Sequence, residues 1–225
     1  MTVNESRLPV WAGAQSIYGC ALNLFPARTA QCLYPRLLPD NEILLGKALV
    51  FSDHQFLNLL KHGLGMPRVV TFLLSPYHSA CTLVHLFKIG RLYKKNQSKA
   101  SCFVQLGGSL AAICTYMNYQ KKACTIFEPE KKYNLLVGIS GSEKKYLLCH
   151  RDNTGWTVEP TEEKFSASAS LSFKNHGIAR KASLGQLDSW LALTQGEVLL
   201  AGHIPMLDKF GYVARIAQRE IPLPR

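Results

Sequence analysis

The sequence predicts an α+β fold: a five-stranded, mainly antiparallel sheet covered by helices on one face, with an N-terminal helical extension. Two observations predict it. In several short segments after residue 132, apolar residues alternate at the period of two that is typical of strands. In residues 103–117 and 206–217 they recur every three or four positions, which is typical of helices with a buried face. Consecutive strands with helices before and after them indicate an α+β arrangement.

The strands are expected at 133–139, 144–150, 155–160, 166–173 and 197–203. The first three form a meander, because the segments 140–143 and 151–155 between them are typical of tight turns. The fourth strand has the clearest pattern. Serine alternates in it with alanine, leucine and phenylalanine, so one face of the strand is expected to be buried and the other solvated.

Two short helices are expected between the fourth and fifth strands, and a longer helix after the fifth. Gly185 separates the short helices; Asp188 caps the second, and Gly196 ends it by taking a left-handed conformation. Pro205 suits the first turn of the last helix. The buried stripe of that helix is expected to be Met206, Phe210, Val213 and Ala217.

The division expected is a basic helical N-terminal region at 1–100 and the sheet domain at 101–225. Within the first region, residues 11–34 are partly helical with a break at Pro26, and a short helix runs from Ser52 or Asp53 to His62. Another helix follows Pro76 and continues to about Lys95. Segment 43–51 is apolar and compatible with helix or strand, and segments 37–41 and 94–101 are expected as a turn and a polar loop.

A helix with one buried face is expected from Phe103, with the stripe Phe103, Leu106, Leu110, Ile113 and Met117. The small residues Gly107, Gly108, Ala111 and Ala112 would let a neighbouring helix approach closely.

A spaced pattern follows the alternating strand: Gly185-x-Leu187-Asp188, then Ala192, Gly196, Val198, Leu200 and Gly202. With the order strand, two short helices, strand and helix, this pattern resembles the sterol carrier protein 2 family. The resemblance covers the second half of the chain. It implies a non-enzymatic, cofactor-free fold with an apolar cavity between sheet and helices that accepts fatty acids, acyl-CoA or sterol-like molecules.

The residues expected to line that cavity are apolar and come from the fourth strand onward. They are Leu171, Phe173, Ile178, Leu184, Leu187, Trp190, Leu191, Val198, Leu200, Met206, Leu207 and Phe210. Burying an acyl chain gains about 0.8 kcal/mol per methylene, so apolar walls suffice to bind it. The alternative for each of these residues is ordinary core packing.

The net charge of +11 is concentrated in the first half of the chain. Residues 1–125 hold 13 Lys and Arg against 4 Asp and Glu, whereas residues 126–225 hold 13 against 11. Such a field attracts polyanions. The candidate contact residues are Lys88, Arg91, Lys94, Lys95 and Lys99, and an anionic membrane surface is the partner expected before nucleic acid, because no nucleic-acid motif accompanies them. The alternative is a solvated helix end.

His78, Cys81 and His85 fall on one face of the helix after Pro76, at a spacing that suits zinc or copper. The same face continues to Lys88, beside an apolar stripe of Tyr77, Ala80, Val84 and Phe87, so we interpret it as the boundary of an amphipathic helix and expect no metal.

Seven cysteines without a C-x-x-C pair, and no signal peptide, favour reduced thiols and a cytoplasmic location. Segments 69–90 and 102–117 are too interrupted by polar residues or glycines to be expected to span a membrane.

The function predicted from the sequence is binding or transfer of a lipid or other apolar ligand, with docking on anionic membranes. One alternative is an interaction protein whose cavity is filled by its own side chains and whose basic N-terminal half binds a protein or nucleic acid. Another is an enzyme that carries the lipid-binding module as an accessory, although residues 1–125 hold no catalytic motif. The ligand and the oligomeric state are left open.

Overall fold

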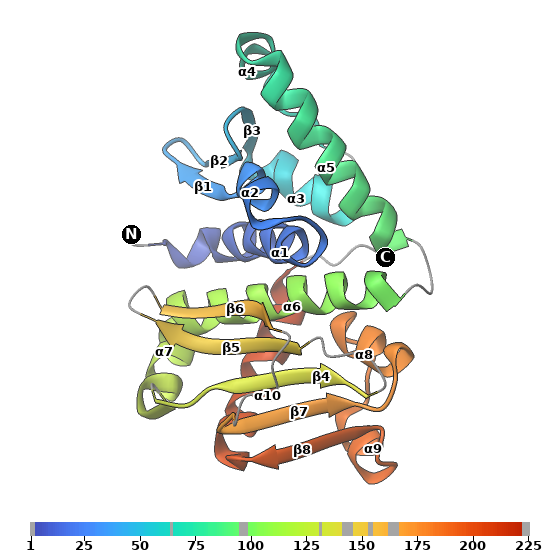
Figure 1. Cartoon of the computed structure of the whole chain (residues 1–225). Coiled ribbons are helices and arrows are strands. Elements are labelled where there is room, and N and C mark those ends of the chain that lie inside the picture. The colour runs from blue at the N-terminus through green and yellow to red at the C-terminus, as the bar shows by residue number, and fades with distance from the viewer. Residues whose placement is uncertain are drawn as a thin grey trace.

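The computed structural model describes residues 3–63, 65–94, 99–130, 132–140, 146–152, 155–161 and 167–221, without the side chains of residues 93, 94, 99 and 100. In Figure 1 a long helix, α6 (Lys99–Tyr119), lies across the middle of the molecule. Helix α1 (Leu8–Leu24) and the rest of the N-terminal region pack on one side of α6, and a five-stranded sheet lies on the other. The predicted division at residue 100 falls just after the start of α6, the helix that contacts both parts.

The N-terminal region contains a small sheet as well as helices. Its elements after α1 are α2 (Ala27–Ala30), β1 (Pro35–Leu38), β2 (Glu42–Leu45), β3 (Leu49–Ser52), α3 (Asp53–His62), α4 (Val69–Leu74) and α5 (Pro76–Lys94), with single 3-10 turns at Glu5–Arg7 and Gln31–Leu33. The three strands form an antiparallel sheet in the order β1-β2-β3. The description of this region as helical was therefore incomplete.

Segment 43–51, for which the sequence left helix and strand open, consists of two strands. They are separated by Gly46, which has φ +65° and lies so close to the Cys32 carbonyl that a Cβ would come within 2.0 Å of its oxygen. Asp40 and Asn41 also take positive φ in the predicted turn between β1 and β2. The polar loop predicted at 94–101 is shorter than expected: residue 94 ends α5 and residues 99–101 begin α6, while residues 95–98 lie outside the described residues.

Of the two residues predicted to start α3, Ser52 is the N-cap, and it forms a reciprocal cap with Gln55 that was not predicted from the sequence. The Ser52 hydroxyl accepts from the Gln55 backbone N–H, and the Gln55 side chain accepts in turn from the Ser52 backbone N–H. Gly63 ends the helix with φ +71°.

Helix α6 is buried almost all round, and not on one face as its stripe predicted. The reason is its position between α1 and the sheet, where its second face also meets protein. The predicted close approach does occur: a Cβ on Gly19 of α1 would come within 2.7 Å of the Gly107 carbonyl oxygen, and one on Gly108 within 3.0 Å of the Ser16 carbonyl oxygen. Two backbones can only meet in this way where side chains are missing.

The large sheet has the order β6-β5-β4-β7-β8. Its strands are β4 (Leu135–Ile139), β5 (Tyr146–Asp152), β6 (Gly155–Thr161), β7 (Ala169–Phe173) and β8 (Val198–Gly202). The first three form the predicted meander, although the turn at 140–143 lies mostly outside the described residues. Strand β7 pairs with β4 in parallel and with β8 antiparallel, so the sheet is mainly antiparallel but mixed.

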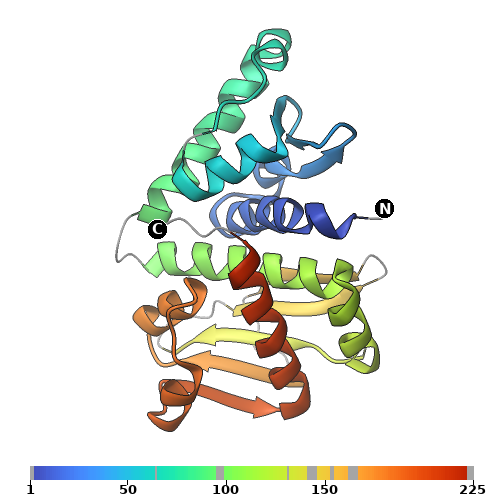
Figure 2. The same cartoon turned by 180° about the vertical axis from the view of Figure 1, so that it is seen from behind.

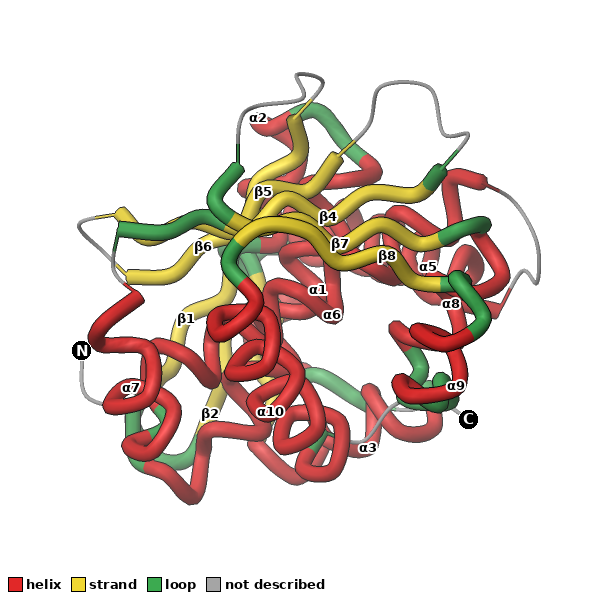
Figure 3. The backbone as a smooth tube through the Cα atoms, turned by 90° about the horizontal axis from the view of Figure 1, so that it is seen from below, coloured by secondary structure: helices red, strands yellow, loops and turns green. Residues whose placement is uncertain are grey.

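The helices of this half are α7 (Lys121–Phe127), a 3-10 turn at Glu128–Glu130, α8 (His176–Ser183), α9 (Ser189–Thr194) and α10 (Ile204–Glu220). Figure 2 shows α10 lying across one face of the sheet, and in Figure 3 α8 and α9 lie on that same side. The predicted stripe of α10 is buried against the sheet: Met206, Phe210, Val213 and Ala217. The α+β fold predicted from the sequence is confirmed.

Candidate functional site

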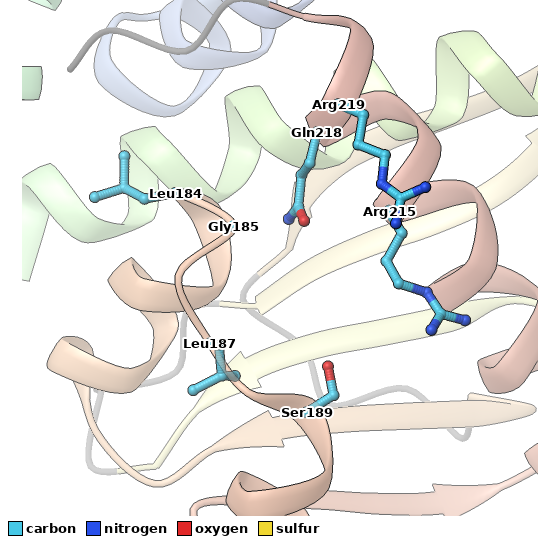
Figure 4. Close-up of a pocket in the computed structure, with 7 residues that line it drawn as sticks. All are labelled: Leu184, Gly185, Leu187, Ser189, Arg215, Gln218 and Arg219. Carbon is cyan, nitrogen blue, oxygen red and sulfur yellow. The ribbon is translucent and has the colours of Figure 1, made fainter.

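A pocket of about 340 Å³ opens between the α8–α9 connection and the last turns of α10. Its size lies near the lower end of the range for small-molecule sites, about 300–1,000 Å³. The residues around it, shown in Figure 4, come from two short segments of the chain. They are Leu184, Gly185, Leu187 and Ser189 on one side and Arg215, Gln218 and Arg219 on the other.

Local backbone structure positions the first wall. At the end of α8, Gly185 has φ +68°, and its N–H donates to the Ala182 carbonyl at 3.1 Å. This left-handed residue turns the chain toward α9, which Asp188 then caps by accepting from the N–H groups of Trp190 and Leu191 at 3.0 and 3.1 Å. Leu187 lies between Gly185 and the Asp188 cap, and it packs against the apolar core.

A side-chain hydrogen bond joins the two walls. The Gln218 Nε2 group of α10 donates to the Ala182 carbonyl oxygen at 3.0 Å. The Gln218 side chain also lies so close to Gly185 that a Cβ there would come 3.2 Å from Oε1. The width of the pocket at this point is therefore set by a direct contact between α10 and the end of α8.

Two guanidinium groups stand on the α10 side of the pocket. Arg215 and Arg219 are exposed and four residues apart, so they share one side of the helix. Neither forms an ion pair with any residue that the structure describes. Guanidinium groups bind carboxylate and phosphate with two parallel hydrogen bonds, so this side of the pocket suits an anionic group. Leu184 and Leu187 belong to the other wall, and in Figure 4 the side chain of Leu184 points away from the arginines.

The twelve residues predicted to line a cavity are divided among three surroundings. Leu184 and Leu187 lie on the pocket. Trp190 and Leu191 are exposed on α9, Trp190 to 82%. The others belong to the main apolar core or pack against it: Leu171, Phe173, Ile178, Val198, Leu200, Met206, Leu207 and Phe210. Their role in ligand binding stays a prediction.

The residues that the sequence did not single out are Ser189, Arg215, Gln218 and Arg219. A signal was available for the last three, because they occupy the side of α10 that is left over once the buried stripe is assigned. What periodicity could not supply is the neighbour of that side, the α8–α9 connection, which is distant in the sequence.

A second polar cluster surrounds Glu130, at the other end of α10. Its buried carboxylate accepts from Lys209 and lies 2.9 Å from His203 Nε2, and the Tyr133 ring packs on His203 with centroids 4.2 Å apart. Burial pushes the pKa of Glu130 upward, but the hydrogen bonds from Lys209 and His203 outweigh it and leave the pKa below its ordinary value. The cluster attaches the start of α10 to the turn after α7.

The predicted polyanion-binding residues are only partly described. Lys88 and Arg91 are exposed on α5, whereas the side chains of Lys94, Lys95 and Lys99 lie outside the described residues.

On the neighbouring face of α5, His85 packs edge-on against Phe25, with ring centroids 4.7 Å apart. Its pKa is lowered, first by burial and then by Lys88. Within the described ranges, no group of three or more His, Cys, Asp or Glu side chains is arranged to hold a metal ion. None of the seven cysteines forms a disulfide. Burial raises the pKa of Cys102 to about 11, which keeps it protonated at neutral pH.

Among the described residues, no helix is both long and apolar enough to cross a membrane.

Comparison with known proteins gives matches at the level of structure. No protein-family model matches the sequence, and no curated protein does. Solved structures similar to part of the chain include the following three. One is described as a UbiJ-SCP2 ubiquinone synthesis protein, with 16% identity and a TM-score of 0.37, and the match covers 50% of this chain and 94% of that one.

The other two are solution structures. The sterol carrier protein domain 2 of Helicoverpa armigera has 12% identity and a TM-score of 0.40, covering 51% of this chain and 89% of that one. A conserved hypothetical protein of Thermus thermophilus, named as a possible sterol carrier protein, has 13% identity and a TM-score of 0.35, covering 48% and 83%. All three descriptions contain the sterol carrier protein name or its abbreviation, and each match covers about half of this chain.

Proposed function

We propose that the chain binds an amphipathic lipid in the pocket between α10 and the α8–α9 connection. The observation that supports this proposal is that one opening is lined by two leucines of the α8–α9 connection, Leu184 and Leu187, and by two guanidinium groups of α10, Arg215 and Arg219, neither of which pairs with a described carboxylate. Of the ligand classes expected from the sequence, fatty acids and acyl-CoA fit this arrangement better than a sterol-like molecule, because a carboxylate or phosphate can pair with guanidinium.

The binding is proposed to be non-enzymatic and to serve carriage or transfer of the ligand in the cytoplasm. Docking on anionic membranes through Lys88, Arg91, Lys94, Lys95 and Lys99 belongs to the same proposal, since exchange of a lipid requires contact with a bilayer. Each basic residue near an anionic surface contributes about 1 kcal/mol to such attraction.

A second candidate is an interaction protein without a ligand cavity. It is favoured by the packing of Met206 and Phe210, two predicted lining residues, in the middle of the apolar core. In this case the pocket at Arg215 and Arg219 is only a surface depression, and the basic N-terminal region binds the partner.

The experiment that separates the two candidates is ligand titration of the full chain after delipidation. A fluorescent long-chain fatty acid and an acyl-CoA are titrated into the wild type, into Arg215→Glu/Arg219→Glu, and into the control Arg28→Glu/Arg36→Glu. The control makes the same change of charge at two exposed arginines that lie outside the pocket.

We expect saturable binding that weakens at least about tenfold in the pocket variant and stays within about twofold of wild type in the control. Absence of saturable binding by the wild type, or equal weakening in both variants, contradicts the pocket and leaves the interaction protein as the better candidate. Thermal unfolding of each variant verifies that it is folded.

A further inference from the structure

Helix α5 presents its apolar stripe to solvent. Tyr77 is 76% exposed and Phe87 71% exposed, and Val84 between them is exposed as well. The opposite side of the helix packs on the protein through Ile89 and through small polar residues at the buried positions Ser79 and Thr82. A surface helix of a globular protein usually keeps its main apolar stripe toward the core, whereas α5 leaves these large apolar side chains in solvent.

Helix α4 extends this exposed surface. It has no buried residue, and Leu74, at its end, is 77% exposed. With the start of α5 it projects from the rest of the chain, as Figures 1 and 2 show. We define the α4–α5 apolar surface by its exposed members: Met66, Val69, Val70, Leu73, Leu74, Tyr77, Val84 and Phe87. Large exposed apolar patches mark sites of interaction with a partner or a membrane.

The charge around this surface has one sign. Between Asp53 and Glu128 the sequence contains no acidic residue and nine Lys and Arg. Lys88 and Arg91 are exposed beside the apolar stripe, and neither pairs with a described carboxylate. Arg68, at the start of α4, pairs with Glu42 but remains more than half exposed.

These properties match an anionic lipid surface better than the other partners. A helix with an apolar face bordered by Lys and Arg lies in the membrane interface, with its apolar side chains among the acyl chains and its cations among the headgroups. Nucleic acid has no apolar face of this extent to offer. A second copy of the chain would bring Lys88 and Arg91 toward cations of the same kind, which repel one another.

We propose that the α4–α5 apolar surface inserts into the interfacial layer of an anionic membrane. The inference deepens the docking part of the proposed function, because it names the inserting element and replaces attraction by charge alone with insertion of apolar side chains. It does not depend on the pocket. Helix α4 lies at the opposite end of the molecule from β8 and α9 (Figure 1), so vesicle binding and pocket occupancy are separate measurements.

The test is cosedimentation of the full chain with vesicles of phosphatidylcholine, alone or mixed with phosphatidylglycerol. The variant Leu73→Asp/Leu74→Asp is compared with the control Leu193→Asp/Leu199→Asp. Both pairs are exposed leucines, so the change of charge is matched, and neither control residue belongs to the set predicted to line a cavity. We expect wild type and control to bind the phosphatidylglycerol vesicles, and the α4 variant to bind at least about tenfold more weakly.

Insertion has a spectroscopic signature that charge attraction lacks. In Leu74→Trp/Trp190→Phe the remaining native tryptophans, Trp11 and Trp156, are buried. Lipids brominated on their acyl chains are therefore expected to quench the new tryptophan, and to leave the emission of the wild type largely unchanged.

Three results would overturn the inference: no binding of the wild type to either vesicle, equal binding of wild type and the α4 variant, or absence of quenching in a vesicle-bound Leu74→Trp/Trp190→Phe protein. A wild-type dimer in solution that the α4 variant converts to a monomer, without vesicle binding by either, identifies the surface as a contact between copies and also overturns it. Fatty-acid titration of the same samples reports on the pocket independently.

Discussion

Gln218 of α10 holds the end of α8 through a single hydrogen bond, from Nε2 to the Ala182 carbonyl oxygen at 3.0 Å. The bond joins the two walls of the pocket. It therefore couples the position of α10 to that of the α8–α9 connection, which carries Leu187. The side chain of one residue thereby links the two walls directly.

Replacement Gln218→Leu removes this bond while keeping the size of the side chain. We expect a loss of about 1 kcal/mol in the free energy of unfolding, the usual net contribution of one hydrogen bond. Urea unfolding measures it. If the proposed pocket binds lipid, the affinity for fatty acid also falls, because the wall is less well positioned. An unchanged unfolding free energy would show that the bond contributes nothing in solution.

Gly185 and Gly196 form a matched pair for a test of the same contact. Both have positive φ, +68° and +65°, but a Cβ on Gly185 meets Gln218 whereas one on Gly196 meets nothing within 4 Å. Each substitution by alanine costs about 1–2 kcal/mol for the left-handed backbone alone. We expect Gly185→Ala to be the more destabilising of the two and to be the one that changes ligand affinity. Equal effects contradict the close approach of Gln218.

Glu130→Gln removes the carboxylate shared by His203 and Lys209. Because these partners are partly exposed, we expect a loss of about 1–3 kcal/mol at neutral pH. The pKa of Glu130 is lowered in the folded state, so its stabilising effect is present above the pKa of the unfolded chain and is lost as the pH falls through the folded-state pKa. The difference between wild type and variant should therefore shrink in acid.

Glu159→Gln is the control, because it removes the same negative charge at a carboxylate on the surface. Glu159 is exposed and lies 3.7 Å from His150, so its loss is expected to change stability by no more than about 0.5 kcal/mol. Urea unfolding of both variants across the acidic range checks the prediction, and a constant effect of Glu130→Gln at every pH would contradict it.

Substitutions of Phe210 and Trp190 test which of the predicted cavity-lining residues are core residues and which are surface residues. Both were predicted to line a cavity, but Phe210 is buried in the main core and Trp190 is 82% exposed. We expect Phe210→Ala to cost about 3–5 kcal/mol and Trp190→Ala less than about 0.5 kcal/mol, as measured by urea unfolding. A small cost at Phe210 would indicate that its side chain faces an open cavity, and would favour a larger ligand site than the pocket at Arg215.

Local features of the fold could be predicted from the sequence because each depends on a few neighbouring residues. The serine alternation of β7, a start of α3 at Ser52 or Asp53, the Asp188 cap and the place of Pro205 in the first turn of α10 were all expected from the sequence. Periodicity also identified the apolar stripes of α5 and α10. Periodicity alone shows only which residues lie on the same side of a helix or strand.

Tertiary structure decided which of those sides is covered. The stripe of α10 is buried on the sheet, whereas that of α5, with Tyr77 and Phe87, faces solvent. The same holds for the second buried face of α6, for the parallel pairing of β7 with β4, and for the meeting of Gln218 with Gly185. In each case the contact joins segments far apart in the chain. Spacing along one segment carries no information about its neighbour in space, so the pocket and the α4–α5 apolar surface emerged only from the folded structure.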